Sequence, residues 1–136
     1  MQAMQTMQTI TVDNDAVAPK FYEWGAVKWV IDEAGAPGTR QSFGVVYIHP
    51  GKTNPTHWHT TAQEVVHMLQ GECDIRTDDS TVTLRAGQTL FIPVGAPHEL
   101  TNRGWEPAVY VCSFSASGRG TLFADPDGPG VEPIQR

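Results

Sequence analysis

Turn-forming residues divide this chain into segments that suit strands rather than helices. Its 136 residues include 13 glycines and 10 prolines, and no long amphipathic helix pattern lies between them. The segments between the turns are often rich in β-branched and aromatic residues, as is typical of half-buried strands. Short strands at such regular spacing predict an all-β sandwich or barrel. We expect strands at residues 21–31, 43–49, 57–59, 64–70, 72–76, 81–85, 88–92 and 108–114.

The length and apolar content suit one domain. With 40% hydrophobic residues, a chain of this size can bury a single core without disulfide bonds. We expect the β-barrel over residues 16–124. Residues 1–15 begin with the low-complexity segment MQAMQTMQT and are predicted to form a flexible tail, with an added edge strand as the alternative. Residues 125–136 are rich in Pro, Gly and Asp and are predicted to form a surface tail.

Charge and hydropathy argue against several kinds of partner. The formal net charge is −6, and the nine Lys and Arg residues form no basic run, so neither nucleic acid nor an anionic membrane surface is expected to bind. No apolar run approaches the roughly 20 residues that span a bilayer. The first ten residues lack a secretory signal pattern, so we expect a cytoplasmic protein. Cys73 and Cys112 form no CxxC pair and are predicted to be small buried side chains.

Three residues in the centre of the sequence have the pattern of a metal site. His57 and His59 are separated by one residue, so in an extended strand both imidazoles project to the same face. Thr60 to Gln63 allow a turn before Glu64 opens the next strand. If that strand pairs back antiparallel, the Glu64 carboxylate reaches the space that the two imidazoles face. Two imidazoles and a carboxylate are ligands for a divalent transition metal.

A third imidazole follows a second strand and turn. The segment from Gly87 to His98 reads as a strand, then a Pro and Gly turn, and then a histidine. Glycine permits backbone conformations that a Cβ disfavours, and Pro93 limits the freedom of the turn. This order of strand, turn and histidine makes the His98 imidazole a candidate third ligand.

Together these segments resemble the cupin superfamily. Gly51-x5-His57-x-His59-x4-Glu64-x6-Gly71 matches the first cupin motif, and Gly87-x5-Pro93-x-Gly95-x2-His98-x3-Asn102 matches the second. The two motifs and their spacer cover residues 51–102. The resemblance implies a double-stranded β-helix, or jelly-roll barrel, that holds one metal ion through three histidines and one glutamate. Those ligands would be His57, His59, Glu64 and His98, with Asn102, Gly71 and Gly87 in structural roles.

The other histidines have no place in this predicted site. His67 alternates with Glu64, Val66 and Met68, so it faces away from the metal and is predicted to have a structural or interface role. His49 ends a strand beside a proline, which leaves its direction open.

Aromatic and apolar side chains divide between the core and the outer surface. Trp58 lies between two inward histidines and is predicted to face outward. Lys28 lies within an apolar strand and is predicted to be at a sheet edge, with an anion contact as the alternative. Four side chains could line the barrel, mostly as core: Tyr47, Val66, Met68 and Phe91.

The predicted ligand set suggests a class of chemistry but not a substrate. Three neutral imidazoles and one carboxylate leave a divalent ion with a residual charge of about +1. A six-coordinate ion would keep two positions for a small bidentate oxygen ligand. We therefore expect a dioxygenase-type oxidoreductase acting on a small oxygen-rich molecule, with Fe, Mn, Ni, Zn, Co or Cu as the metal.

Two other functions stay open on the sequence. One is a non-redox isomerase, decarboxylase or lyase acting on a sugar or oxo-acid, and the other is a metal-stabilised ligand-binding protein without turnover. No catalytic acid or base can be assigned, although Tyr47, His49 and Tyr110 are candidates. We also expect a homodimer, because small cupins commonly pair and because outward-facing material is predicted at Trp24, Trp29, Trp58 and His67.

Overall fold

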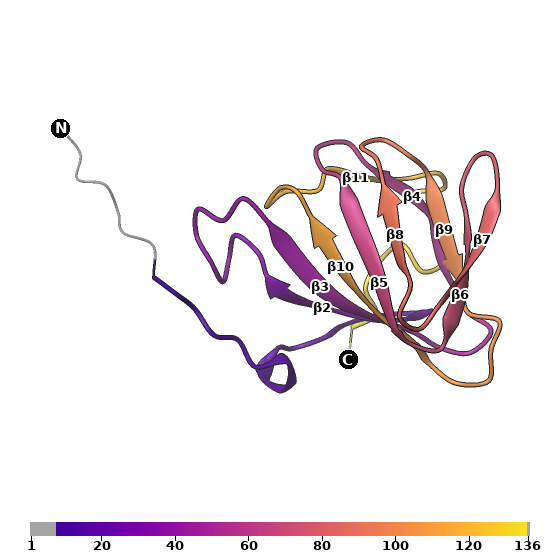
Figure 1. The fold of residues 1–136 in the computed structure, drawn as a ribbon, viewed down its shortest axis with the longest axis horizontal. Coiled ribbons are helices and arrows are strands. Elements are labelled where there is room, and N and C mark those ends of the chain that lie inside the picture. Colours follow the sequence, from indigo (N-terminus) through magenta and orange to yellow (C-terminus); the bar gives the residue numbers. More distant parts are fainter. Residues whose placement is uncertain (1–7, 136) are drawn as a thin grey trace.

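The computed structural model describes residues 8–135 and is built almost entirely of antiparallel strands (Figure 1). Apart from one short 3-10 helix, η1, the described elements are strands that alternate with turns. In chain order the elements are η1 (Asn14–Ala16), β1 (Lys20–Tyr22), β2 (Gly25–Ile31), β3 (Ser42–Ile48), β4 (Thr53–His59), β5 (Glu64–Gln70), β6 (Glu72–Arg76), β7 (Thr81–Arg85), β8 (Thr89–Ile92), β9 (His98–Thr101), β10 (Ala108–Phe114) and β11 (Thr121–Phe123).

The strands form two sheets with a jelly-roll order. The six-stranded sheet runs β1-β2-β3-β10-β5-β8, and the five-stranded sheet runs β11-β4-β9-β6-β7. Most neighbours in each sheet are distant in sequence, because successive strands from β3 onward often cross from one sheet to the other. Figure 1 shows the two sheets facing each other around a common interior. The expected all-β jelly-roll fold is confirmed.

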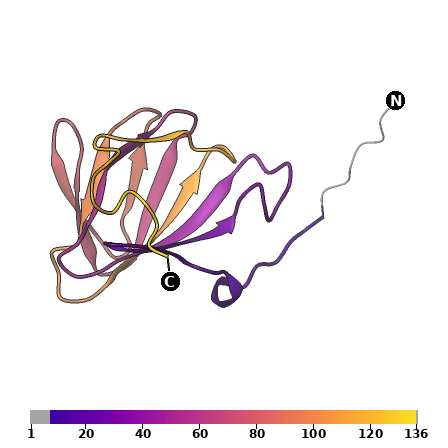
Figure 2. The same ribbon diagram turned by 180° about the vertical axis from the view of Figure 1, so that it is seen from behind.

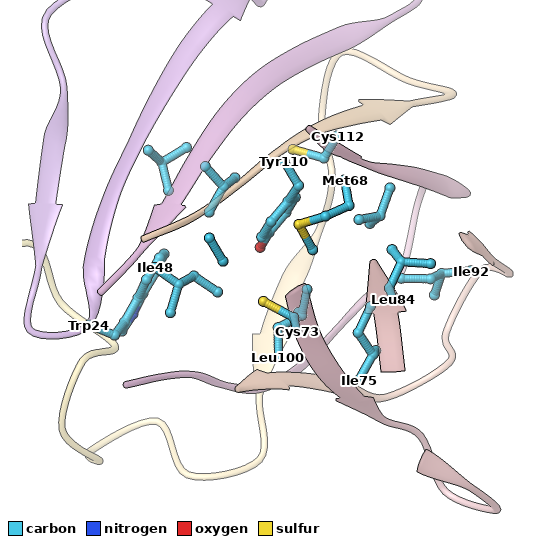
Figure 3. Close-up of a cluster of buried hydrophobic side chains, with 14 of the residues drawn as sticks. Trp24, Ile48, Met68, Cys73, Ile75, Leu84, Ile92, Leu100, Tyr110 and Cys112 are labelled. Atoms are coloured by element: carbon cyan, nitrogen blue, oxygen red, sulfur yellow. The ribbon is translucent and has the colours of Figure 1, made fainter. Parts of the chain in front are cut away.

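The core fills the space between the sheets and follows the alternation of the strands. Along β10 every second residue is buried, and along β5 the buried residues are Glu64, Val66 and Met68. Figure 3 shows side chains from both sheets meeting in one cluster, including Met68, Ile75, Leu100 and Tyr110. Because the metal-site pattern begins on this same inward face, the core and the candidate site share one interior.

The two cysteines are small buried side chains, as predicted. Cys73 and Cys112 are both free and buried, and Cys112 directs its thiol toward the carbonyl oxygen of Gly44. Burial raises the pKa of the Cys73 thiol to about 12 and that of Cys112 well above its ordinary value. Both thiols are therefore protonated, unreactive members of the core.

The structure corrects the predicted strand at 21–31, and with it the predicted exposure of two tryptophans. The chain turns at Glu23 and Trp24 between β1 and β2, so these residues form a hairpin rather than one strand. Trp24 is only 3% exposed and stacks on Tyr22, with ring centroids 5.0 Å apart. Trp29 is half-buried and packs against Phe114, with ring centroids 5.9 Å apart. Neither ring provides the outward-facing surface that the sequence suggested.

Two of the four side chains predicted to line the barrel point away from it. Phe91 is 56% exposed, because its neighbours Leu90 and Ile92 occupy the inward positions of β8. Tyr47 faces outward from β3 for the same reason, and its hydroxyl accepts a hydrogen bond from Asn14 at 3.4 Å. Val66 and Met68 do lie in the core.

The C-terminal segment packs back against the barrel. The Ile134 amide donates to the carbonyl of Phe21, and the Trp24 indole donates to the carbonyl of Gly130 at 2.9 Å. Figure 2 shows this yellow segment crossing the molecule. At the other end, residues 8–13 have no regular structure, and residues 1–7 of the predicted flexible tail lie outside the described part of the chain. No helix in the described part is both long and apolar enough to cross a membrane.

Candidate metal centre

Three strands bring the four predicted ligands together. His57 and His59 project inward from β4, while Trp58 between them lies on the other face beside Leu122 of β11. Glu64 is the first residue of β5, and His98 is the first residue of β9, paired directly with His57. All four ligand side chains are buried, and the His98 side chain is only 1% exposed. The strand period of two and the antiparallel pairing therefore produce the expected convergence.

Each histidine ring is oriented by a partner on its Nδ1 atom. The Nδ1 atom of His57 lies 2.6 Å from the carbonyl oxygen of Pro55, and that of His98 lies 2.9 Å from the carbonyl oxygen of Ala96. A carbonyl can only accept, so in both rings Nδ1 carries the proton and Nε2 keeps its lone pair. The His59 Nδ1 atom lies 3.0 Å from the Thr121 hydroxyl, which can donate or accept. Fixing one ring nitrogen in this way orients the other nitrogen as a metal ligand.

The ligand atoms of the four residues face one another. Candidate ligand atoms of His57, His59 and His98 all lie within 4.8 Å of one another. The Glu64 Oε1 atom lies 3.2 Å from Nε2 of His59 and also 3.2 Å from Nε2 of His98. Despite this proximity, these three atoms are buried without a hydrogen-bond partner. The lone pairs of Glu64 Oε1 and His98 Nε2 repel each other at this distance, and a cation among the three atoms would satisfy all of them at once.

The electrostatics of the site keep the ligands in their metal-binding forms. Burial, assisted by the neighbouring His98, lowers the pKa of His57 to about 4, so the ring is neutral at physiological pH. Burial alone would raise the pKa of Glu64, but hydrogen bonds and charge interactions with His59 and His98 in their protonated forms outweigh it and lower the pKa to about 2, so the carboxylate stays ionised. A neutral imidazole beside an ionised carboxylate is the donor set that a divalent transition metal requires.

A buried asparagine fixes the end of the strand that carries His98. Asn102 donates from Nδ2 to the carbonyls of Ile48 and Glu106, both at 2.9 Å, and its Oδ1 accepts from the Gly104 amide. Its backbone carbonyl also accepts from the Gly51 amide. These bonds join β9 to the end of β3 and to the turn before β4. The structural role implied for Asn102 is therefore visible in its contacts.

The tight connection at Gly71 requires glycine. Gly71 joins β5 to β6 with φ of +71°, a conformation that side chains with a Cβ rarely adopt. A Cβ there would also approach the Pro107 carbonyl oxygen to 3.0 Å. This turn sends the chain from one sheet to the other directly after the strand that bears Glu64.

The site opens into a cavity of about 240 Å³ with aromatic walls. Its lining includes Trp29, Asn54, Tyr110, Phe114 and Arg119, in addition to three of the predicted ligands. The Phe114 ring meets the His59 ring edge to face at 4.9 Å. Burial raises the pKa of Tyr110 well above its ordinary value, so its hydroxyl stays protonated and can donate a hydrogen bond. The ligand set and the cavity are therefore continuous.

Most cavity residues outside the ligand set carried no signal in the sequence. Tyr110 was one of three candidates for an acid or base, and the other two lie elsewhere, because His49 is exposed and Tyr47 faces outward. Arg119 lies between two glycines in an irregular segment that matches no pattern. The same holds for Thr121, whose role depends on the pairing of β11 with β4. His67 lies off the site, as predicted, and its Nδ1 atom contacts the Thr89 hydroxyl at 2.8 Å.

Known proteins have sequences related to part or most of this chain. A 78-residue segment is 37% identical to the rhicadhesin receptor of Pisum sativum and covers 54% of this chain and 36% of that protein. A 112-residue segment is 28% identical to polyketide synthase CurC of Streptomyces cyaneus and covers 82% of this chain and 73% of that protein. The chain thus spans little more than a third of the plant protein.

Solved structures with the same fold include two proteins named for oxalate chemistry. The formate complex of Lactobacillus farciminis oxalate decarboxylase superposes with a TM-score of 0.74 and 27% identity, covering 81% of this chain and 34% of that one. Recombinant oxalate oxidase in complex with glycolate superposes with a TM-score of 0.68 and 31% identity, covering 83% of this chain and 59% of that one.

The family itself follows from a direct match. The family model described as a cupin domain matches residues 44–114, which is more than half of the 136 residues. The matched region runs from β3 to the end of β10 and contains all four residues of the candidate centre. This chain therefore belongs to the cupin domain family.

Proposed function

We propose that the chain binds one divalent transition-metal ion through His57, His59, Glu64 and His98. The observation that supports this most directly is the set of buried, unpartnered atoms: Nε2 of His59 and His98, and Oε1 of Glu64. Nothing in the described protein satisfies them, and a cation of the borderline-soft class accepts this donor set. Fe, Mn, Ni, Zn, Co and Cu all belong to the range that such ligands bind.

The proposed reaction is a dioxygenase-type oxidation of a small oxygen-rich molecule. A bound ion would supply Lewis acidity and, if it is redox-active, an electron-transfer centre. The residues of the chain supply the surroundings. Phe114 and Trp29 form apolar walls that limit water, and the protonated Tyr110 hydroxyl offers a hydrogen bond to a substrate oxygen. A cavity of about 240 Å³ suits a small molecule.

A non-redox reaction is the second candidate. The likeness to Lactobacillus farciminis oxalate decarboxylase favours carbon–carbon cleavage of an oxo-acid or a related lyase or isomerase reaction. Oxygen consumption against a panel of diketones, catechols and oxo-acids separates the two, because only the oxidative reaction consumes dioxygen. Tight binding of a panel member without turnover would instead identify a binding protein.

The metal site itself is tested by removing one ligand. We expect close to one equivalent of bound metal after dialysis of the wild-type protein against metal, and much less in His57→Ala. His67→Ala is the matched control, because His67 lies on β5 outside the centre and its ring contacts the Thr89 hydroxyl instead. Elemental analysis of all three proteins provides the measurement. Equal metal content in wild type and His57→Ala would contradict the proposed metal site.

For the assembly we propose a homodimer. The support comes from the outer face of the six-stranded sheet, where Val65, Leu69 and Phe91 are all exposed apolar side chains on β5 and β8. Such a patch on a small barrel is commonly covered by a second copy.

A further inference from the structure

A cationic side chain lies in the cavity outside the metal centre. Arg119 lies in the segment between β10 and β11, and its guanidinium carbon lies 3.5 Å from the centroid of the Trp29 ring and 5.5 Å from that of Phe114. It lines the same cavity as His57, His59 and Glu64. Stacking on an aromatic face stabilises a guanidinium and leaves its N–H groups, which lie in the plane, available to a ligand.

The carboxylates of Asp32 and Glu64 act on the charge of Arg119 from a distance, but neither is close enough to pair with its guanidinium. Among the described residues no carboxylate forms an ion pair with this guanidinium, whereas Arg76, Arg85 and Arg103 each pair with a carboxylate on the surface. No acceptor for its N–H groups is found in the same part of the chain. Arginine keeps its charge at physiological pH, so a half-buried guanidinium without a direct ion pair is suited to receive an anionic group from a ligand.

The segment that carries Arg119 is tied to the metal-binding loop. The Thr60 hydroxyl donates to the Gly120 carbonyl at 2.9 Å, and the Thr61 hydroxyl donates to the Gly118 carbonyl at 2.7 Å. These two bonds flank Arg119 on both sides. Thr60 and Thr61 lie between His59 and Glu64, so the backbone on both sides of Arg119 is held close to the candidate ligands.

We propose that Arg119 binds a carboxylate group of the substrate while other oxygen atoms of the same molecule bind the metal. This assignment rests on the proposed metal-dependent function and narrows it to small acids with two polar ends, such as 2-oxo or 2-hydroxy dicarboxylic acids. The planar guanidinium suits a bidentate contact with a carboxylate, and the aromatic walls accommodate the short apolar middle of the molecule. Arg119 is then the residue that selects the distal group.

The test compares two acids that differ only at the distal end. The probes are 2-oxoglutarate and 2-oxovalerate, which share the 2-oxo acid group and the chain length but differ by one distal carboxylate. Titration calorimetry on the metal-loaded wild type is expected to show at least about tenfold tighter binding of 2-oxoglutarate. Arg119→Met should remove that preference, and Arg119→Lys, which keeps the charge but not the planar fork, should retain part of it.

A second cation at the cavity provides the control. Lys20 also lines the cavity but is exposed, so Lys20→Met should keep the preference for the dicarboxylate. Equal affinity of the wild type for both acids, or a preference that survives in Arg119→Met, would overturn the proposal. So would a preference that depends on Lys20 instead.

Failure of the metal site is read separately. Metal content is measured on the same samples, and the titrations are repeated on metal-free protein with tryptophan fluorescence as the readout. If no metal binds, the proposed function fails. The metal-free protein can still prefer the dicarboxylate, and if Arg119→Met removes that preference, the result supports the anion site alone. Absence of that preference in both forms would contradict the assignment of Arg119.

Discussion

At the residue scale, the orientation of each imidazole determines what the candidate centre can bind. For His57 and His98 the Nδ1 partner is the carbonyl of the residue two positions earlier, Pro55 or Ala96. Both rings are therefore fixed by local backbone, and their Nε2 lone pairs are directed inward whether or not the rest of the site is complete. Burial and the neighbouring His98 lower the pKa of His57 even though the Pro55 hydrogen bond raises it, because a second proton would have to be placed in the interior.

The pH dependence of stability follows from these shifts. In the unfolded chain a histidine takes up a proton near pH 6.5, whereas folded His57 resists protonation until about pH 4. The unfolded state therefore binds more protons between these values, and the free energy of unfolding falls as the pH decreases from about 6.5 to 4. Glu64 affects stability in a lower pH range. Its pKa is about 4.5 in the unfolded chain and about 2 in the folded protein, so it contributes stability above pH 4.5 that is lost as the pH falls further toward 2.

Bound metal makes the acid sensitivity steeper. Only neutral histidines bind the ion, so protons compete for three ligands at once. We expect metal to raise the melting temperature strongly at pH 8 and very little near pH 4, where folded His57 itself takes up a proton. Melting curves from pH 4 to 8, with and without metal, provide the measurement, and His57→Ala should show almost no metal-dependent increase at any pH. An increase as large at pH 4 as at pH 8 would mean that histidines do not dominate the site.

At the scale of elements, β11 shows how a short strand completes the centre. β11 has three residues, lies at the edge of its sheet, and pairs only with β4. That pairing places Thr121 opposite His59, and the hydroxyl reaches the His59 Nδ1 atom at 3.0 Å. His57 and His98 have local carbonyl partners, whereas His59 depends on this distant strand for its orientation.

Removal of the Thr121 hydroxyl should weaken metal binding without unfolding the protein. Partners on the second nitrogen of a ligating histidine are typically worth about 10- to 100-fold in metal affinity. We expect a loss in this range for Thr121→Val, which keeps the β-branched shape, and near wild-type affinity for Thr121→Ser, which keeps the hydroxyl. Competition with a metal chelator measures both. Equal affinity of the Val and Ser variants would show that the hydroxyl does not orient His59.

The strands differ in how far the sequence predicts them. β5, β6, β7 and β10 begin and end at the expected residues, because each is a run of suitable residues closed by turn formers. β9 and β11 were not predicted. They have four and three residues, and both pair with β4, a strand that lies far away in the sequence. The same distinction applies to the site. The four candidate ligands lie in local motifs and could be predicted. Thr121 reaches the cavity through the pairing of β11 with β4, and Arg119 through the irregular segment before it, and no local pattern indicates either.

At the scale of the whole molecule, the outer face of the six-stranded sheet is the surface best suited to a partner. The sequence assigned this role to Trp24, Trp29, Trp58 and His67. Trp24 is in the core and Trp29 lines the cavity, whereas Trp58 and His67 lie at outward positions of β4 and β5. The exposed apolar side chains on this face belong instead to outward positions of β5 and β8. Val65 is 39% exposed and pairs directly with Phe91, and Leu69 on the same strand is 53% exposed. The inward positions of these strands carry Glu64 and the core, so association through the outer face would leave the cavity intact.

The predicted homodimer can be tested on this face with a charge. Phe91→Glu places a carboxylate on the apolar surface beside Val65, where burial in an interface would require its desolvation. We expect light scattering at micromolar concentration to give a dimer mass for the wild type and a monomer mass for Phe91→Glu. Val82→Glu is the matched control, because Val82 is 42% exposed on β7 in the other sheet and should remain in a dimer. Metal content should be unchanged in both variants, since neither position lines the cavity. A monomeric wild type would contradict the homodimer, and a dimer that Val82→Glu disrupts and Phe91→Glu does not would move the interface to the five-stranded sheet.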